Sequence, residues 1–327
     1  MRWSLFIVLA AVAAMVVVAV MAVLPVDPNG EPRLVFIPSG SSSADIGHRL
    51  ERAGVIGRAL DFVILVRLRG LTRSLQDGEY RLSPAMGLLD IVDRIARGAV
   101  VHYPVTIPEG YTARQIVEEL VQTRLGDRDE FLRLVRTGAK GYDLEFLGAL
   151  TGTSLEGYLF PDTYQIPRHL EERAALRLFL DRFGELVLPR WRESGRGRPL
   201  HEIVTVASMV EREARVPAER PLIAGVIYNR LARGWKLEVD ATVLYALGQH
   251  KPIVTFADLK VDSPYNTYLH PGLPPGPIAN PGLAAIDAAL NPTKTDYLYY
   301  VARADGSHVF SRTLGEHEAA VRRYRGR

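Results

Sequence analysis

Residues 200–215 read LHEIVTVASMVEREAR, an amphipathic stretch that predicts a helix ending in two glutamates. Its apolar side chains recur every three or four positions and share one face of a helical wheel: Ile203, Val206, Ala207, Val210 and Ala214. We expect this face to be buried. Glu213 lies at its edge, following Met209 and Val210 by four and three residues. Glu211 has smaller neighbours at the matching positions, so Glu213 is expected to be the more desolvated carboxyl group.

Burial against apolar side chains raises the pKa of a carboxylic acid, and an acid that must hold its proton near neutral pH needs that shift. Glu213 is therefore a candidate general acid/base. The competing interpretation is a solvated residue at the end of a surface helix, because most glutamates in folded proteins are exposed. Periodicity alone does not decide between the two.

The chain downstream of this helix is rich in aromatic, polar and proline residues. Residues 237–248 read LEVDATVLYALG, and residues 262–282 read DSPYNTYLHPGLPPGPIANPG. Flat rings next to hydrogen-bonding groups on proline-stiffened loops are typical of a sugar-binding cleft. Each tyrosine considered by itself could equally be a packing residue.

Three strand-turn-helix units lie upstream of this region, at residues 35–54, 80–98 and 105–122. In each helix two apolar residues are spaced by four and so share a face: Ile46 and Leu50, Ile91 and Ile95, Ile116 and Leu120. Ser43 and Thr112 are the expected helix caps. The pattern predicts an α+β fold class. Small modules of this kind resemble LysM-like carbohydrate-binding folds, which adds glycan binding as a hypothesis.

The N-terminus predicts a membrane anchor. Residues 5–24 contain no charged side chain and are about as long as a membrane-spanning helix. A cleaved signal peptide usually has a shorter apolar region, and Arg2 on the short side favours an N-terminus in the cytoplasm. We therefore expect residues 1–4 to be cytoplasmic, 5–24 to span the cytoplasmic membrane, and 25–32 to be a linker. A LysM-like domain at 33–103 and a catalytic domain at 104–327 would then be extracytoplasmic.

Composition excludes several other classes. The formal net charge of +3 is small and the basic residues are scattered, so no nucleic-acid partner is indicated. The chain has no cysteine, which removes disulfides, thiolate nucleophiles and cysteine zinc sites. Zinc-protease, serine-hydrolase, Walker A and dinucleotide-binding motifs are also missing. The eight histidines are dispersed, and His201 is interpreted as a polar residue near a helix start. No metal and no cofactor are implied.

Seven motifs occur in an order that is similar to one known family. They are EGYLFPDTY, ASMVEREA, VIYNRL, LEVDATVLYALG, YNTY, GLPPGPIANPG and YLYYVARADGSHVFSRT. Together they closely resemble the YceG-like family of endolytic murein transglycosylases, over essentially the whole chain. The resemblance implies an N-terminal anchor, a LysM-like segment and a larger α+β catalytic domain.

The resemblance also implies a reaction and a site. Such enzymes cleave the MurNAc–GlcNAc β-1,4 bond of nascent glycan strands without water and leave a 1,6-anhydro-MurNAc end. The second glutamate of the family's helix motif is its single general acid/base, and it corresponds to Glu213. Ala214 stands where many other lytic transglycosylases have serine, so their helper residues do not transfer. Substrate binding is assigned by the resemblance to five residues: Glu156, Tyr158, Asp240, Tyr265 and Asn266.

Two alternatives stay open. A muramidase-type hydrolase would need a second carboxylate, for which Asp240 and Asp262 are the candidates. A non-catalytic scaffold would use the modules only to bind the cell wall. The expected partners are peptidoglycan glycan strands and the cytoplasmic membrane, and the family's role in strand termination suggests peptidoglycan synthases as well.

Overall fold

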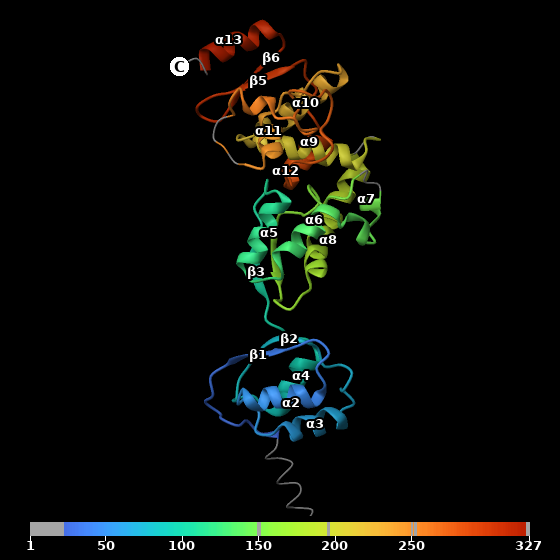
Figure 1. The fold of residues 1–327 in the computed structure, drawn as a ribbon, viewed down its shortest axis with the longest axis vertical. Coiled ribbons are helices and arrows are strands. Elements are labelled where there is room, and N and C mark those ends of the chain that lie inside the picture. Colours follow the sequence, from blue (N-terminus) through green and yellow to red (C-terminus); the bar gives the residue numbers. More distant parts are fainter. Residues whose placement is uncertain (1–22, 149–151, 195–196, 250, 252–253, 325–327) are drawn as a thin grey trace, which may run out of the picture. The chain divides into compact units, whose positions relative to one another are not determined.

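The computed structural model describes residues 23–148, 152–194, 197–249, 251 and 254–324 (Figure 1). The chain divides into two compact units. The first ends at Pro104 and also includes Gln165–Leu170, and the second consists of Val105–Tyr164 and the chain from Glu171 onward. Sequence analysis drew this division one residue earlier and did not anticipate the return of Gln165–Leu170. The described residues combine helices with three two-stranded sheets, as the expected α+β class requires.

The described part of the chain contains no helix with the length and apolar character needed to cross a bilayer. The expected anchor, residues 5–24, lies outside the described residues except for its last two positions, and it stays a prediction. The expected linker, residues 25–32, is described and forms turns and irregular backbone.

The described residues of the first unit form a two-stranded sheet and the helices that pack on it. Strands β1 (Arg33–Ile37) and β2 (Gly78–Leu82) pair antiparallel, with Arg33 opposite Leu82. Between them the chain forms helices α2 (Ser43–Arg52) and α3 (Ala59–Leu68), and α4 (Leu88–Ala96) follows β2. Figure 1 shows β1 and β2 on one side of this unit and α3 on the other. Sequence analysis did not predict α3, and the resemblance to LysM-like domains stays a prediction.

The predicted apolar pairs form the centre of the first unit. Ile46 and Leu50 of α2 and Ile91 and Ile95 of α4 are buried against the inner face of the sheet. The expected cap of α2 is wrong by one residue: Ser42, not Ser43, accepts the backbone N–H of Asp45, because Ser43 is already helical.

The second unit contains most of the helices. Strands β3 (Tyr103–Thr106) and β4 (Thr163–Ile166) pair with each other, and the boundary between the two units passes through both strands. The following segments belong to this unit: α5 (Ala113–Gln122), α6 (Arg128–Thr137), α7 (Glu145–Gly148), α8 (Glu172–Ser194), α9 (Leu200–Glu213), α10 (Arg220–Ala232), α11 (Asp240–Leu247), α12 (Leu283–Leu290), β5 (Tyr299–Ala302), β6 (His308–Ser311) and α13 (Leu314–Tyr324), with 3₁₀ turns at Ala139–Gly141, Pro217–Glu219 and Asp258–Lys260. Thr112 caps α5 as predicted, in a reciprocal pair with Gln115.

Helix α9 lies at the centre of the second unit, packed by α10, α11 and α12. Four residues of its predicted apolar face are buried, and so is every other side chain from Ile203 to Val210. The fifth, Ala214, is half-buried and follows the last residue of the helix. A helix that is buried all round needs its few polar groups satisfied internally. Ser208 meets this need by donating to the Thr205 carbonyl and accepting the backbone N–H of Ile278. The helix is therefore held on all sides, and Glu213 is its last residue.

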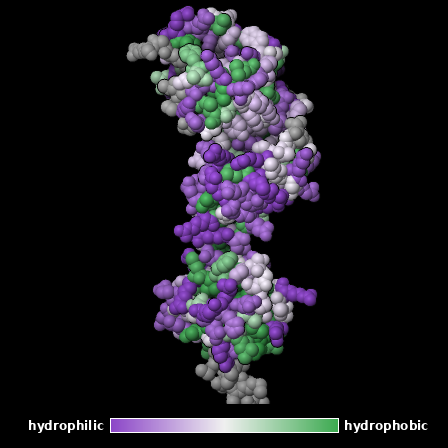
Figure 2. Space-filling model, in the orientation of Figure 1, coloured by the Kyte–Doolittle hydropathy of each residue, from purple (hydrophilic) through white to green (hydrophobic). Residues whose placement is uncertain are grey.

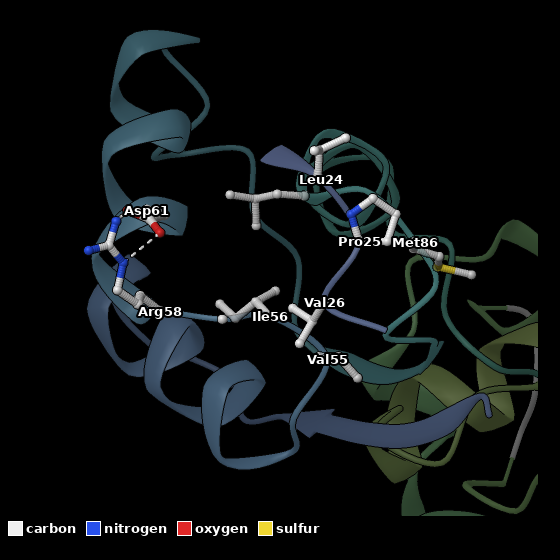
Figure 3. A pocket seen from close by; sticks show the side chains of 10 residues that line it. Leu24, Pro25, Val26, Val55, Ile56, Arg58, Asp61 and Met86 are labelled. Atoms are coloured by element: carbon white, nitrogen blue, oxygen red, sulfur yellow. Dashed lines mark hydrogen bonds and ion pairs between the residues drawn. The ribbon is translucent and has the colours of Figure 1, made fainter. Parts of the chain in front are cut away.

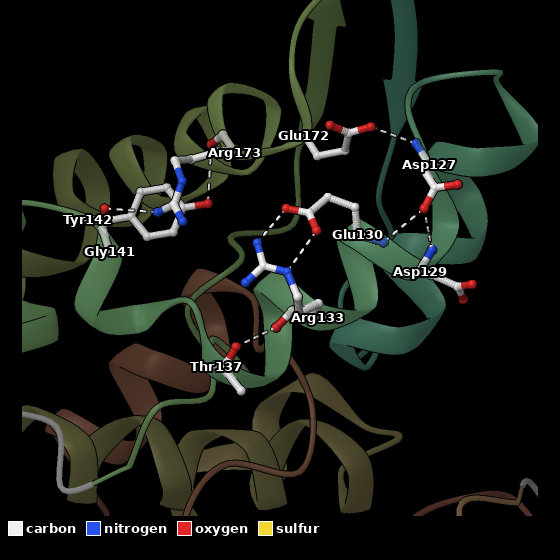
Figure 4. A network of polar contacts seen from close by, with 9 residues as sticks. All are labelled: Asp127, Asp129, Glu130, Arg133, Thr137, Gly141, Tyr142, Glu172 and Arg173. Carbon is white, nitrogen blue, oxygen red and sulfur yellow. Dashed lines mark hydrogen bonds and ion pairs between the residues drawn. The ribbon is translucent and has the colours of Figure 1, made fainter.

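A polar network fastens α6 to α8 (Figure 4). The Glu172 carboxylate accepts the backbone N–H of Asp127, 2.7 Å away, and Asp127 in turn caps α6. Arg173 donates to the carbonyl of Gly141 and accepts, through its own carbonyl, the hydroxyl of Tyr142. These bonds fix α6, which lines the pocket around Glu156 that is described below.

Candidate active site

Glu213 lines a pocket of about 280 Å³ in the second unit. Its walls come from the end of α9, from α10 and the start of α11, and from the β5–β6 hairpin. We call it the Glu213 pocket. The side chains on its walls that carry polar groups include Arg230, Glu238, Asp240, Tyr268 and Tyr300.

Two donors point at the Glu213 carboxylate. The Tyr300 hydroxyl hydrogen-bonds to it, and burial followed by the Glu213 charge raises the pKa of Tyr300 well above its usual range. Tyr300 therefore stays protonated and donates. The backbone N–H of Ala241 also donates to Oε1, over 3.5 Å, from the first turn of α11. The free amides of a helix N-terminus interact favourably with negative charge, so both donors can stabilise Glu213 once it has given up a proton.

Asp240 brings a second carboxyl group to the same pocket. The Tyr268 hydroxyl donates to its Oδ1 over 2.5 Å, and burial, this bond and the Glu213 charge raise the pKa of Tyr268. Asp262, the other candidate for a second carboxylate, is exposed and does not line the pocket. The structure thus brings together Glu213 and Asp240 of the predicted site residues.

Arg230 organises the loop that leads to Asp240. Its buried guanidinium donates to the carbonyls of Leu298 and Leu237, over 2.8 and 2.6 Å, and pairs with Glu238 at 3.0 Å. Glu238 has a φ of +54°, a left-handed conformation that is costly for a non-glycine residue. The ion pair helps to hold this strained residue two positions before Asp240.

Asn266 also supports the loop that leads to Asp240. It is fully buried, and its amide group donates to the carbonyls of Leu259 and Val261. Its neighbour Thr267 accepts the backbone N–H of Val239. Asn266 therefore positions the backbone around Tyr268 and Asp240, and its burial argues against the direct substrate contact that was predicted.

The two glutamates of α9 differ in their partners more than in burial. Both residues are half-buried, and the Glu211 side chain is only 7% exposed. Glu211 pairs with Arg220 and accepts the backbone N–H of Gly282. It also raises the pKa of neighbouring Glu109, after the larger effect of burial. The expectation that desolvation singles out Glu213 is thus replaced by a different criterion. Glu211 pairs with Arg220, and Glu213 lines a pocket in which it accepts the hydroxyl of Tyr300.

Glu156 lines a second, larger pocket of about 800 Å³, which we call the Glu156 pocket. Its carboxylate accepts the backbone N–H of Ala113, the amide of Asn280 and the hydroxyl of Tyr245. Burial raises the pKa of Glu156 to about 7, although these three bonds oppose the shift. Gly157 follows with a φ of +88°, and a Cβ there would lie 2.4 Å from Pro277. The glycine in the EGYLFPDTY motif is required by this close approach.

Helix α11 forms part of the wall of both pockets. Asp240 faces the Glu213 pocket, while Ala241, Leu244 and Tyr245 line the Glu156 pocket. The ring of Tyr265 packs against Tyr245, with centroids 4.8 Å apart. Of the predicted binding residues, Glu156 and Tyr265 are therefore brought together by Tyr245, which sequence analysis did not select. The Glu156 pocket is also rich in arginine: Arg114, Arg128, Arg136 and Arg212 line it.

Tyr158 lies in the core instead of in either pocket. It is 1% exposed, packs against Phe146 and Phe183, and hydrogen-bonds through its hydroxyl to Nδ1 of His201. Its predicted contact with substrate is not supported by this placement. Among the described residues no group of three or more His, Cys, Asp or Glu side chains is arranged to hold a metal ion.

Sequence analysis missed Tyr300, which contacts Glu213, and Arg230, which pairs with Glu238 in the loop before Asp240. Tyr300 lies within the quoted YLYYVARADGSHVFSRT motif, but its role depends on a strand far along the chain reaching the end of α9. Arg230 reads in sequence as an ordinary basic residue near a helix end. The buried carbonyl groups that accept hydrogen bonds from Arg230 come together only in the folded chain.

The fold and the site define an α+β protein with a carboxylate-lined pocket at the end of a central buried helix. The model of the YceG-like family matches residues 35–323. A crystal structure of a putative YceG-like protein from Listeria monocytogenes is 37% identical, with a TM-score of 0.59, and the match covers 89% of this chain and 100% of that one. The chain belongs to the YceG-like family.

Curated relatives carry a functional name. A protein of Bacillus subtilis (strain 168) named endolytic murein transglycosylase is 36% identical over 316 residues, which cover 92% of this chain and 87% of that protein. A protein of the same name from Streptococcus pneumoniae serotype 2 is 32% identical over 331 residues. This match covers 92% of this chain but only 60% of the longer pneumococcal protein.

Proposed function

We propose that this chain is an endolytic peptidoglycan lytic transglycosylase in which Glu213 is the general acid/base. The arrangement around Glu213 carries the proposal: a carboxyl group at the end of an immobile helix, in a pocket, with donors from Tyr300 and Ala241. The names of its relatives support the activity class. We also propose that the substrate is a nascent glycan strand, cleaved at the MurNAc–GlcNAc β-1,4 bond.

The reaction would use one carboxyl group twice. Protonated Glu213 donates its proton to the glycosidic oxygen while the C1–O bond breaks through an oxocarbenium-like state. The carboxylate then removes the proton from the C6 hydroxyl of the same sugar as O6 attacks C1. This closes the 1,6-anhydro ring and returns the proton to Glu213, so no water is consumed. The two donors stabilise the carboxylate in the interval between these transfers.

The surroundings suggest separate tasks for the remaining residues. Asp240, which accepts the Tyr268 hydroxyl, would contact the sugar in the Glu213 pocket. Glu156 and Tyr245 line the neighbouring pocket, which would take further parts of the strand, and Tyr265 would support Tyr245 through ring contact. We further propose that residues 5–24 anchor the chain in the cytoplasmic membrane, with its N-terminus in the cytoplasm and both units outside.

Product analysis tests the proposal. Purified protein would be incubated with uncrosslinked glycan strands, and the fragments identified by liquid chromatography and mass spectrometry. Wild type is expected to produce 1,6-anhydro ends, and Glu213→Gln none, while still binding strands. Glu211→Gln is the matched control, because it makes the same change two residues away at a carboxylate that is paired with Arg220. Full activity of Glu213→Gln would refute the role of Glu213.

A muramidase-type hydrolase is the second candidate, favoured by one observation: Asp240 shares the pocket with Glu213. Hydrolysis needs such a second carboxylate to activate water or to act as a nucleophile. Digestion in heavy-oxygen water separates the two reactions. Hydrolysis places the label at a new reducing end, whereas the transglycosylase incorporates none.

A further inference from the structure

Helix α3 of the first unit is apolar on two opposite faces. One face carries Ala59, Phe62 and Val66, which are buried in the core of the unit. The other carries Leu60, Ile64 and Leu68, which follow one another at a spacing of four and so form a stripe along the helix. These three side chains are 64%, 46% and 81% exposed. We call them the α3 stripe.

A helix that is apolar all round is normally covered on every side, by protein or by lipid. Single exposed leucines are common on soluble proteins, but a continuous apolar stripe marks an interaction surface. Within the part of the chain that the structure describes, the α3 stripe is not covered. Because the opposite face of α3 already packs on the core, the helix cannot rotate to hide the stripe.

The α3 stripe lies at the end of the unit where the described chain begins. Leu24 and Val26, each more than half exposed, line an apolar pocket of about 320 Å³. Arg58 and Asp61, at the start of α3, line the same pocket (Figure 3). In Figure 2 apolar side chains gather at this end of the unit. Leu24, the last residue of the uncharged run 5–24, thus belongs to this apolar pocket.

Unpaired basic residues accompany the stripe. Arg67 lies beside it on the helix, and Arg73 follows shortly after, and both are exposed. Among the described residues neither has a carboxylate within ion-pair distance, whereas Arg58 and Arg69 are paired with Asp61 and Asp93. An apolar stripe flanked by arginine is the pattern of a helix that lies in the interface of a bilayer with anionic lipids.

We propose that the α3 stripe docks on the surface of an anionic bilayer, with Leu60, Ile64 and Leu68 inserted at the boundary between headgroups and acyl chains. Arg67 and Arg73 would then contact lipid phosphates. The proposal rests on the anchoring part of the proposed function and not on its chemistry. It goes beyond an anchor, because it assigns the membrane a second contact that fixes how the first unit is oriented on the bilayer.

Site-specific fluorescence on the full chain tests this proposal. The chain has no cysteine, so a single introduced cysteine can be labelled uniquely with an environment-sensitive dye. Ile64→Cys and Leu68→Cys report on the stripe. Phe36→Cys is the matched control, because Phe36 is 50% exposed, similar to Ile64, but lies on β1 at the other side of the unit. The labelled proteins would be reconstituted into vesicles of phosphatidylethanolamine and phosphatidylglycerol that carry spin-labelled lipid.

The expected result is a blue-shifted emission at positions 64 and 68 that the spin-labelled lipid quenches, with neither effect at position 36. Pure phosphatidylcholine vesicles should weaken the effect, because they lack anionic headgroups for Arg67 and Arg73. Leu60→Ser and Leu68→Ser, made separately, should each lower the equilibrium constant for docking, measured with the dye at position 64, roughly tenfold.

Two results would overturn the proposal. One is emission at position 64 that matches position 36 in every vesicle. The other is a blue shift at position 64 that spin-labelled lipid does not quench and that increases with the protein-to-lipid ratio. That result would mean that the α3 stripe binds a second copy of the chain. Cleavage of soluble glycan strands by the same labelled samples is measured separately, so loss of docking and loss of the proposed chemistry are distinguishable.

Discussion

The hydroxyl of Tyr300 donates a hydrogen bond to the carboxylate of Glu213, joining the β5–β6 hairpin to the end of α9. The two residues are 87 positions apart, so the hairpin must be in place before this carboxyl group has its full set of partners. The bond stabilises the negative charge that Glu213 carries before it takes up a proton in the second half of the proposed reaction.

Tyr300→Phe should therefore lower kcat with little change in the binding of glycan strands. A hydrogen bond to a charged group contributes about 1.5–3 kcal/mol, which corresponds to a decrease of roughly 10- to 100-fold. Steady-state cleavage of uncrosslinked strands provides the measurement. Tyr297→Phe is the control, since Tyr297 lies on the same segment outside the Glu213 pocket. Equal losses in both variants would indicate a general weakening of the hairpin.

The raised pKa of Glu156 should make the stability of the fold depend on pH. Its pKa is about 7 in the folded protein and about 4.5 when unfolded, so the folded state binds more protons between these values. Stability contributed by the protonated form is fully present below pH 4.5 and is lost as the pH rises through 7. The shift corresponds to a decrease of about 3 kcal/mol in the free energy of unfolding. Glu156→Gln should remove this decrease, as urea titrations across the pH range would reveal; an unchanged slope would contradict it.

Arg230→Lys should be strongly destabilising although it preserves the charge. One ammonium group cannot replace a guanidinium that donates to three carbonyls and Glu238 at once, and unsatisfied buried carbonyls cost about 1–3 kcal/mol each. We expect a lower Tm together with reduced cleavage, because the strained Glu238 precedes Asp240. Arg233→Lys, at an exposed position on the same helix, should leave both unchanged.

Gly157→Ala separates steric clash from backbone strain. Gly157 and Gly272 have φ values of +88° and +86°, but a Cβ at Gly272 would meet no atom within 4 Å. Alanine at either position incurs the cost of the left-handed conformation, about 1–2 kcal/mol. Only alanine at Gly157 must also displace Pro277. A larger loss of thermal stability is therefore expected at Gly157, and equal losses would show that Pro277 can move aside.

The features predicted correctly from the sequence are those set by local periodicity. The apolar pairs of α2, α4 and α5 and the α9 face from Ile203 to Val210 follow from spacings within one helix, and these residues are buried. The Thr112 cap is also a local feature, because the backbone N–H that its hydroxyl accepts belongs to Gln115, three residues away. Helix α3 was missed because it is apolar on both faces, which removes the periodic contrast that identifies a helix at a surface.

The site was predictable only in part, since its contacts join distant segments. Tyr158 and Asn266 are polar residues in motifs rich in aromatic groups, which is how a binding residue looks in sequence. In the fold their polar atoms are used internally, by His201 and by two loop carbonyls. Tyr300, Arg230 and Tyr245 acquire their roles from partners about 7 to 90 residues away, and no local pattern marks them.

The burial of α9 on every side has a consequence for turnover. A carboxyl group carried by a flexible surface helix would have to be immobilised anew for each bond that is cleaved. Here the neighbouring helices and the Ser208 hydroxyl restrain the helix as soon as the chain folds. The entropy of aligning the acid is thus lost once in the lifetime of the molecule, and each later sugar meets an alignment that already exists.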